Sequence, residues 1–234
     1  MKHLQILITL TIIAIASTCA FAATCSEKPK ISLLVESLCP DSRNAVIKSF
    51  GPALAKGLLS MVDVKIIIYG KEQETYNFQT KKWEYTCQNG PSECYGNAFY
   101  NSLLKIMGGF SSEYLDAVVC IYQNVDTKNR DFDSGIKACT AGREKAFLNA
   151  YHMAMSFNYI QWQPLIQAAS LQTPKYISNV PWINLNGEHA NEADENAIVK
   201  DAFKWACEQA DPLCKVEGCQ VYENPKGNIT FSKL

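Results

Sequence analysis

The sequence predicts an α/β fold, and three stretches near the start of the chain carry this prediction. Residues 31–35 form an apolar run typical of a buried strand, and residues 40–58 have apolar side chains at helical spacing. Residues 61–69 form a second apolar run, which indicates a strand buried on both faces of a parallel sheet. Strand, helix and strand in close succession are the pattern of a βαβ unit.

The predicted first helix presents one apolar face, with a bend expected at Gly51-Pro52 because proline interrupts the helical hydrogen bonds. The section at about 71–175 then departs from strand-helix alternation. A polar, aromatic segment at residues 75–85 indicates a hairpin, and helical patterns follow at residues 98–107, 113–122 and 134–155. We interpret this section as a mainly helical insertion stapled by disulfides.

Strand character returns at residues 176–186, where Asn186-Gly187 is a strong hairpin-turn signal. Residues 194–209 carry apolar side chains at helical spacing and predict a last helix. Strand-helix-strand, insertion, hairpin and helix is the order of elements in a thioredoxin-like domain. We therefore expect a single domain of this fold at residues 23–234.

Residues 1–22 have the features of a secretory signal peptide: Lys2 and His3, an apolar stretch, and a small-x-small site at residues 20–22. Nothing after it approaches the roughly 20 apolar residues of a membrane helix, so no membrane span is expected. The net charge of -1 implies no nucleic-acid partner. Asn228 begins the sequon Asn-Ile-Thr and is the predicted glycosylation site. These features indicate the secretory pathway, with a lysosomal, endosomal or secreted destination.

Removal of the signal peptide leaves nine of the ten cysteines. In an oxidising compartment, eight of them could form four bridges, and one would remain free. Cys39 is the chemically distinctive one, because it lies where the first strand turns into the first helix. Backbone N–H groups at a helix N-terminus favour thiolate over thiol. Pro40 suits the first helical turn because it has no N–H to leave unsatisfied.

Spacing alone leaves Cys39 equally compatible with a nucleophile and with one half of a structural bridge. A nucleophile that exchanges disulfides also needs a place for the substrate backbone, and a cis bond at Val180-Pro181 could provide one. A dithiol motif would have its second sulfur at position 42, where this chain has Ser42. Its hydroxyl could donate to the Cys39 thiolate, or Ser42 could be an ordinary first-turn serine.

Other chemistries have less support in the sequence. His152 and His189 are the only histidines after the signal peptide, and neither lies in a hydrolase signature. Zinc would require close cysteine pairs, whereas Cys87 and Cys94 are seven residues apart and an oxidising compartment favours disulfides. No metal or other cofactor is therefore expected. Asp41 and Glu93 are single acids without a partner carboxylate nearby in sequence.

The segment at residues 87–97, hereafter the signature segment, resembles the signature of the gamma-interferon-inducible lysosomal thiol reductase family, Cys-Gln-His-Gly-x-x-Glu-Cys-x-x-Asn-x-x-x-x-Cys. Asn89 stands where the family has histidine, and Ser102 stands for its last cysteine, so that one family bridge is absent or rewired. The matching positions are Cys87, Gln88, Gly90, Glu93, Cys94 and Asn97.

Members of this family are thioredoxin-like reductases that open protein disulfides in acidic compartments with a Cys-x-x-Cys pair. The resemblance places their first cysteine at Cys39 and their second at Ser42, so that the nucleophile is present and the resolving thiol is absent. It also implies a cis-proline strand at Val180-Pro181. Pro40, Asp41, Val180 and Pro181 are then the expected substrate contacts.

The leading hypothesis is thiol-disulfide exchange on protein disulfides through Cys39 alone, with release by a substrate thiol or an external thiol such as glutathione or cysteine. The alternatives are a noncatalytic substrate-binding or chaperone-like module and a purely structural disulfide scaffold. The remaining eight cysteines should then be paired, with Cys87–Cys94 and Cys120–Cys139 as our guesses among the connectivities that eight cysteines allow.

Overall fold

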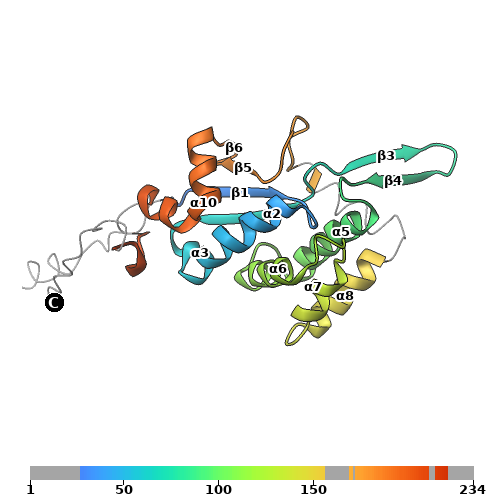
Figure 1. Ribbon diagram of the computed structural model, residues 1–234, viewed down its shortest axis with the longest axis horizontal. Coiled ribbons are helices and arrows are strands. Elements are labelled where there is room, and N and C mark those ends of the chain that lie inside the picture. Colours follow the sequence, from blue (N-terminus) through green and yellow to red (C-terminus); the bar gives the residue numbers. More distant parts are fainter. Residues whose placement is uncertain (1–26, 156–168, 171, 211–213, 221–234) are drawn as a thin grey trace, which may run out of the picture.

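The computed structural model describes residues 27–155, 169–170, 172–210 and 214–220, drawn in colour in Figure 1. The predicted signal peptide, Cys25 and Asn228 lie outside the described residues. At the centre of the described chain is a mixed sheet of four strands in the order β2-β1-β5-β6. Its strands are β1 (Lys30–Val35), β2 (Asp63–Ile68), β5 (Trp182–Leu185) and β6 (Glu188–His189).

The pairing of these strands confirms the predicted fold class. β1 runs parallel to β2, as the βαβ pattern predicts, and antiparallel to β5, which pairs with β6 in turn. Asn186 and Gly187 join β5 to β6 with φ angles of 51° and 95°, the positive values of the predicted hairpin turn. The predicted strand at 176–186 was too long, because regular pairing covers only β5. The arrangement is that of a thioredoxin-like sheet.

A broken helix connects β1 to β2 and packs against the last helix, α10 (Glu192–Gln209). The predicted bend at Gly51-Pro52 takes the form of a π-helical turn, after which the α-helix resumes at Gly51. Ser49 in this turn donates to the Ile198 carbonyl and accepts from the Ala202 N–H, where α10 itself is kinked. The segments of the broken helix are α2 (Pro40–Ala45), η1 (Val46–Phe50), α3 (Gly51–Ala55) and α4 (Leu58–Met61).

The chain between β2 and β5 contains a hairpin and four described helices. The predicted hairpin is present as β3 (Gln73–Asn77) and β4 (Lys82–Thr86), and it projects away from the rest of the molecule (Figure 1). The helices are α5 (Pro91–Ile106), α6 (Ser112–Asn124), α7 (Asp133–Cys139) and α8 (Glu144–Met155). α5 packs against α8, and α6 against α7.

α5 begins earlier than the helical pattern at residues 98–107 predicted. Gly90, with a φ of 89°, ends the preceding turn, and Pro91 occupies the first helical turn. The second half of the signature segment is therefore helical. Its residues Glu93, Cys94, Gly96 and Asn97 are all buried.

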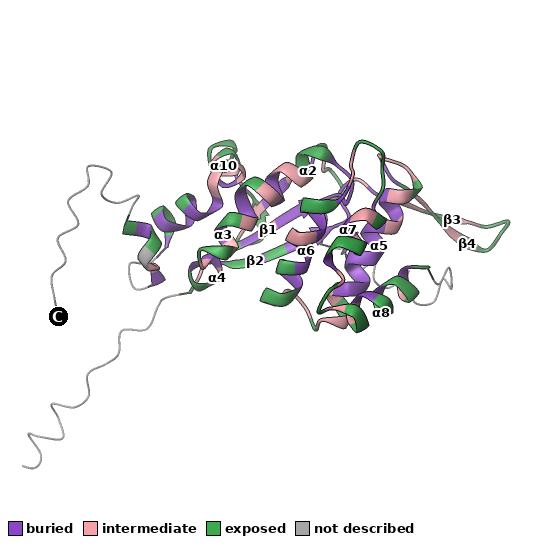
Figure 2. Ribbon diagram, turned by 60° about the horizontal axis from the view of Figure 1, so that its bottom comes forward, coloured by how far each residue is buried: buried purple, intermediate pink, exposed green. Residues whose placement is uncertain are grey.

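The hydrophobic core is continuous between the sheet and the helical insertion. Figure 2 shows buried residues along β1 and through α5, where aromatic rings of the insertion pack edge to face or stack. Within the part of the chain that the structure describes, no helix is long and apolar enough to span a bilayer.

Candidate active site

Cys39 is the N-cap residue of α2, as the sequence predicts. Its carbonyl accepts the first helical hydrogen bond from the Arg43 N–H at 2.9 Å, and Pro40 follows in the first turn. The Cys39 side chain is 5% exposed, whereas Pro40 and Asp41 are exposed beside it. Cys39 is also the free cysteine among the described residues. Cys39 is therefore a nearly buried residue that precedes two exposed ones at the start of the helix.

Disulfides account for the other described cysteines. Cys87–Cys94 and Cys120–Cys139 are bonded, so both predicted pairings are confirmed. A further bridge joins Cys207 to Cys219, and Cys214 is disulfide-bonded as well. The bonded state removes these sulfurs from competition with Cys39 as nucleophiles.

Ser42 is fully buried, and its side chain forms a hydrogen bond with the backbone of the loop that precedes Cys39. Its Oγ accepts from the Glu36 N–H at 3.1 Å. Among the hydrogen bonds of the described residues, none joins Ser42 to the Cys39 sulfur. The hydroxyl thus closes the turn between β1 and α2, and its proton remains available to a neighbouring acceptor.

Val180-Pro181 forms a cis peptide bond, in agreement with the strand that the family resemblance implies. Trp182, the next residue, is paired with Leu34 of β1 across the antiparallel ladder. Continuing this register places Pro181 and Val180 at the end of the sheet where β1 leads into the Cys39 loop. The sheet therefore brings the two predicted halves of the substrate site to one edge, although they are far apart in sequence.

The signature segment lies directly behind the Cys39 loop. The Ser37 N–H donates to Asn97 Oδ1 at 3.0 Å, and the Leu38 N–H donates to Glu93 Oε2 at 3.3 Å. Ser37 Oγ also donates to the Glu93 carbonyl at 2.9 Å. Asn89 binds the Glu93 carboxylate through its N–H at 2.8 Å and its Nδ2 at 2.7 Å. Gln88, by contrast, is exposed.

Three acidic side chains meet in this buried region, so Glu93, which has no partner carboxylate nearby in sequence, has acidic neighbours in the fold. Glu36, Glu72 and Glu93 are 1%, 4% and 0% exposed. Burial, assisted by the charge of Glu93, raises the pKa of Glu36 to about 7. Burial also raises the pKa of Glu72 to about 8, although the hydrogen bond from Asn97 opposes this change. Both groups therefore hold a proton more tightly than an exposed glutamate does.

The contacts of these acids explain why they are tolerated inside the protein. Glu36 Oε1 accepts from the Lys71 N–H at 2.7 Å, and Glu72 Oε2 accepts from Asn97 Nδ2 at 2.9 Å. The Glu36 carbonyl accepts from the Tyr122 hydroxyl at 2.9 Å. Sequence reasoning missed Glu36, Glu72 and Tyr122. An acid directly after an apolar strand, as Glu36 is, was the available signal for a buried carboxyl.

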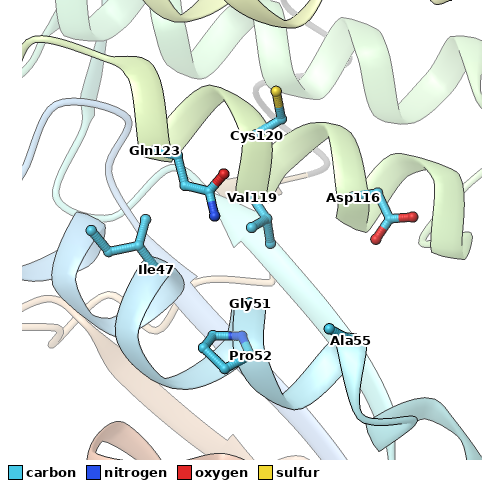
Figure 3. A pocket seen from close by; sticks show the side chains of 8 residues that line it. All are labelled: Ile47, Gly51, Pro52, Ala55, Asp116, Val119, Cys120 and Gln123. Atoms are coloured by element: carbon cyan, nitrogen blue, oxygen red, sulfur yellow. The ribbon is translucent and has the colours of Figure 1, made fainter.

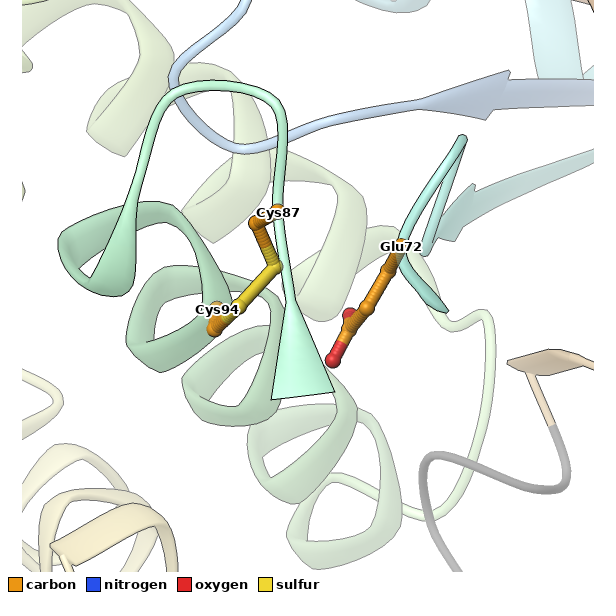
Figure 4. Close-up of side chains that lie close together, drawn as sticks. All are labelled: Glu72, Cys87 and Cys94. Atoms are coloured by element: carbon orange, nitrogen blue, oxygen red, sulfur yellow. A yellow bond between two sulfur atoms is a disulfide. The ribbon is translucent and has the colours of Figure 1, made fainter. Parts of the chain in front are cut away.

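Figure 4 shows the Glu72 carboxyl group directed toward the Cys87–Cys94 disulfide. The two sulfurs and one carboxyl oxygen lie within 4.8 Å of one another, and this is the group of potential metal ligands found among the described residues. The sulfurs are bonded to each other and cannot act as thiolate ligands in this state.

A surface groove of about 350 Å³ lies between the broken helix and α6 (Figure 3). Ile47 and Pro52 line one wall, and Val119 and Gln123 line the other. None of the predicted site residues lines this groove, so the Cys39 site is a separate feature of the surface.

Comparison with known proteins supports the resemblance. The sequence profile of "Gamma interferon inducible lysosomal thiol reductase (GILT)" matches residues 30–143, which include Cys39 and the signature segment. A goldfish (Carassius auratus) gamma-interferon-inducible lysosomal thiol reductase is 25% identical over 82% of this chain and 74% of its own length. A gamma-interferon-responsive lysosomal thiol protein of Arabidopsis thaliana is 27% identical over 72% of this chain and 66% of its own length.

Other comparisons cover shorter segments or more distant proteins. GILT-like protein 1 of Drosophila melanogaster is 35% identical over 36% of this chain and 34% of its own length. Among solved structures, the oxidoreductase DsbA from Xylella fastidiosa aligns with a TM-score of 0.44 and 15% identity over 80% of this chain and 89% of that chain. The family profile and the two long sequence matches show that the chain is similar to members of the gamma-interferon-inducible lysosomal thiol reductase family.

Proposed function

We propose that this protein catalyses thiol-disulfide exchange on protein disulfides with Cys39 as its single nucleophile. The observation that carries the proposal is the position of Cys39: a free cysteine at a helix N-cap, in a chain whose other described cysteines are bonded. Similarity to a family named for thiol reductases supports the same chemistry.

In the first step, the Cys39 thiolate attacks one sulfur of the substrate disulfide. A mixed disulfide forms, and the other substrate sulfur leaves as a thiolate. In the second step, a thiolate of the substrate, or of a small thiol such as glutathione or cysteine, attacks the substrate sulfur of the mixed disulfide. The Cys39 thiolate is regenerated, and a new disulfide joins the attacking thiol to the substrate.

The second step needs this outside thiol because Ser42 stands where a resolving cysteine would lie. The Ser42 hydroxyl accepts a hydrogen bond from the Glu36 N–H, and it cannot attack the mixed disulfide as a thiolate would. Exchange that leaves the number of substrate disulfides unchanged, an isomerase reaction, therefore fits the site better than net reduction. The proposed substrate contacts are Pro40 and Asp41, which follow Cys39 in the chain, and Val180 and Pro181, which form the cis peptide bond.

The proposed setting is the secretory pathway, with an endolysosomal or extracellular destination. The signal peptide predicted at residues 1–22 and the Asn228 sequon support this setting. The eight paired cysteines expected from the sequence suit an oxidising route of synthesis.

The direct test mixes the mature protein with a disulfide-bonded protein substrate, quenches with acid and searches by mass for a substrate adduct on Cys39. Wild type should form the adduct, and Cys39→Ser should not. Ser42→Cys should raise reductase turnover with a dithiol donor, because an adjacent thiol can then resolve the mixed disulfide.

Absence of the adduct from folded wild-type protein would overturn the proposal. If substrate binding then proved equal in wild type and Cys39→Ser, the chain would be a noncatalytic binding or chaperone-like module. A Ser42→Cys variant that folds but gains no turnover would contradict the assigned geometry of position 42.

A further inference from the structure

The backbone just before Cys39 is held by side chains from a distant part of the chain, not by secondary structure of its own. Ser37 and Leu38 are fully buried, so their N–H groups have no access to water. Asn97 Oδ1 and Glu93 Oε2 are the acceptors that satisfy these two groups, at 3.0 Å and 3.3 Å. A buried N–H without an acceptor is costly, so loss of either side chain would force the loop to move.

We propose that Glu93 and Asn97 are positioning residues for the Cys39 nucleophile and that the Cys87–Cys94 disulfide keeps them in place. The proposal rests on the proposed function, since it concerns the same sulfur. It gives the signature segment a role that differs from redox chemistry: neither of its sulfurs exchanges with substrate. Its disulfide instead fixes where the reacting sulfur points.

The close approach of α5 to the loop supports this role. A Cβ atom at Gly96 would lie 2.4 Å from Ser37 Oγ, so the helix lies against the loop at a position that has no side chain. Ser37 Oγ in turn donates to the Glu93 carbonyl at 2.9 Å. Three hydrogen bonds and one tight packing contact thus join two consecutive residues of the loop to one turn of α5.

The signature segment also holds its own acceptors in position. Asn89 donates twice to the Glu93 carboxylate, and the disulfide between Cys87 and Cys94 closes the loop that carries Asn89, with a Cα–Cα distance of 5.6 Å. On the other side, Asn97 Nδ2 donates to Glu72 at 2.9 Å. Opening the disulfide would release Asn89, and with it the orientation of the Glu93 carboxylate toward Leu38.

The substitutions at Asn97 separate positioning from general stability. Asn97→Asp keeps an oxygen that can accept from the Ser37 N–H, and the protonated Glu72 carboxyl can donate to its other oxygen at acidic pH. Asn97→Leu has a similar size and removes the acceptor. A positioning role predicts near-wild-type Cys39 reactivity for the first variant and a large loss for the second.

Two disulfide deletions form a second matched comparison. Cys87→Ala with Cys94→Ala removes the bridge of the signature segment, and Cys120→Ala with Cys139→Ala removes the bridge between α6 and α7. The second bridge closes a longer loop, so its loss should destabilise the protein at least as much. A purely structural role predicts that Cys39 reactivity follows stability in both variants.

The measurement is the second-order rate constant for alkylation of Cys39 by iodoacetamide, recorded from pH 4 to 9 on folded protein, with urea unfolding in parallel. Asn97→Leu and the Cys87/Cys94 deletion should lower the rate constant about tenfold or more and shift the pH profile, since displacement of a reacting atom by about 1 Å can cost a hundredfold. For Asn97→Asp at acidic pH and for the Cys120/Cys139 deletion, the alkylation rate constant should stay within about twofold of the wild-type value.

Equal reactivity of Asn97→Leu and wild type, or equal losses in the two disulfide deletions, would overturn the proposal. If the Cys87/Cys94 deletion does not fold, the comparison of Asn97→Leu with Asn97→Asp decides. Iodoacetamide requires no protein substrate, so the assay is independent of exchange activity. Wild type that is alkylated but forms no substrate adduct would refute the proposed function and leave the positioning role standing.

Discussion

The stability of this protein should fall as the pH rises above about 5, and Glu72 should be a principal cause. The side chain is 4% exposed, and only one of its carboxyl oxygens has a hydrogen-bond partner among the described residues. Burial is the main reason why its pKa rises from an ordinary 4.5 to about 8 in the folded protein. Neighbouring Glu74, Glu93 and Glu36 raise this pKa further, and Asn97 lowers it.

The sign follows from the binding of the proton. The folded state holds the Glu72 proton more tightly than the unfolded state does, so the associated stability is fully present below pH 4.5. It is lost progressively as the pH rises toward 8, where the folded protein also ionises. The difference between a pKa of about 8 in the folded protein and 4.5 in the unfolded chain corresponds to about 5 kcal/mol of unfolding free energy.

The perturbation that isolates this contribution is Glu72→Gln, because the amide oxygen can still accept from Asn97 but the side chain cannot ionise. Urea unfolding should be followed by tryptophan fluorescence from pH 4.5 to 8.5, with Cys39→Ser in both proteins to prevent disulfide exchange. At pH 5 the two unfolding free energies should agree within about 1 kcal/mol. At pH 8.5 the Gln variant should be more stable by several kcal/mol, up to about 5.

Titration of Glu36 occurs in both proteins and largely cancels in the difference between them. The decisive quantity is therefore the change of this difference with pH, not the stability of either protein alone. A difference that stays constant from pH 5 to 8.5 would refute the reasoning, because it would mean that Glu72 is ionised, or is neutral, throughout this range in both the folded and the unfolded state.

Two further substitutions test the packing around the site by urea unfolding. Ser49→Ala should lower the unfolding free energy by about 2 kcal/mol, because it leaves the buried Ile198 carbonyl and Ala202 N–H without their partner. A loss below about 0.5 kcal/mol would show that these two backbone groups find other hydrogen-bond partners when the Ser49 hydroxyl is absent. Gly70→Ala should cost at least about 2 kcal/mol, because φ is 58° and the new Cβ would lie 2.2 Å from Glu36 Cγ; an unchanged midpoint would mean that the Glu36 side chain moves freely.

Much of the fold could be predicted because each element leaves a local pattern. The apolar run at 31–35 and the helical spacing after it report burial and period within a few residues, and they place Cys39 at a helix N-terminus without knowledge of any partner. Asn186-Gly187 specifies its own turn, since both residues tolerate positive φ. The start of α5 was missed because Gly90-Pro91 marks a helix start inside a segment that cysteines make look irregular.

The acidic region behind Cys39 could not be predicted in the same way. Glu36 ends one segment, Glu72 begins the hairpin section, and Glu93 lies in α5, so no sequence window contains all three. Their proximity, and the raised pKa of Glu36 and Glu72, depend on how the β1–α2 loop packs on α5. The same packing makes Glu93 the hydrogen-bond acceptor for the Leu38 N–H, a contact that the sequence does not indicate.

The sequence by itself determined the order of strands and helices, the cysteine at the start of the first helix, and the serine three residues later in place of a second thiol. These are properties of neighbouring residues, and hydrophobic period, helix position and residue identity express them directly. Only the tertiary structure decided that Ser42 binds the Glu36 N–H and that Asn97 and Glu93 hold the loop before Cys39. Such contacts join segments far apart in the chain, and only the packed fold brings them within hydrogen-bond distance.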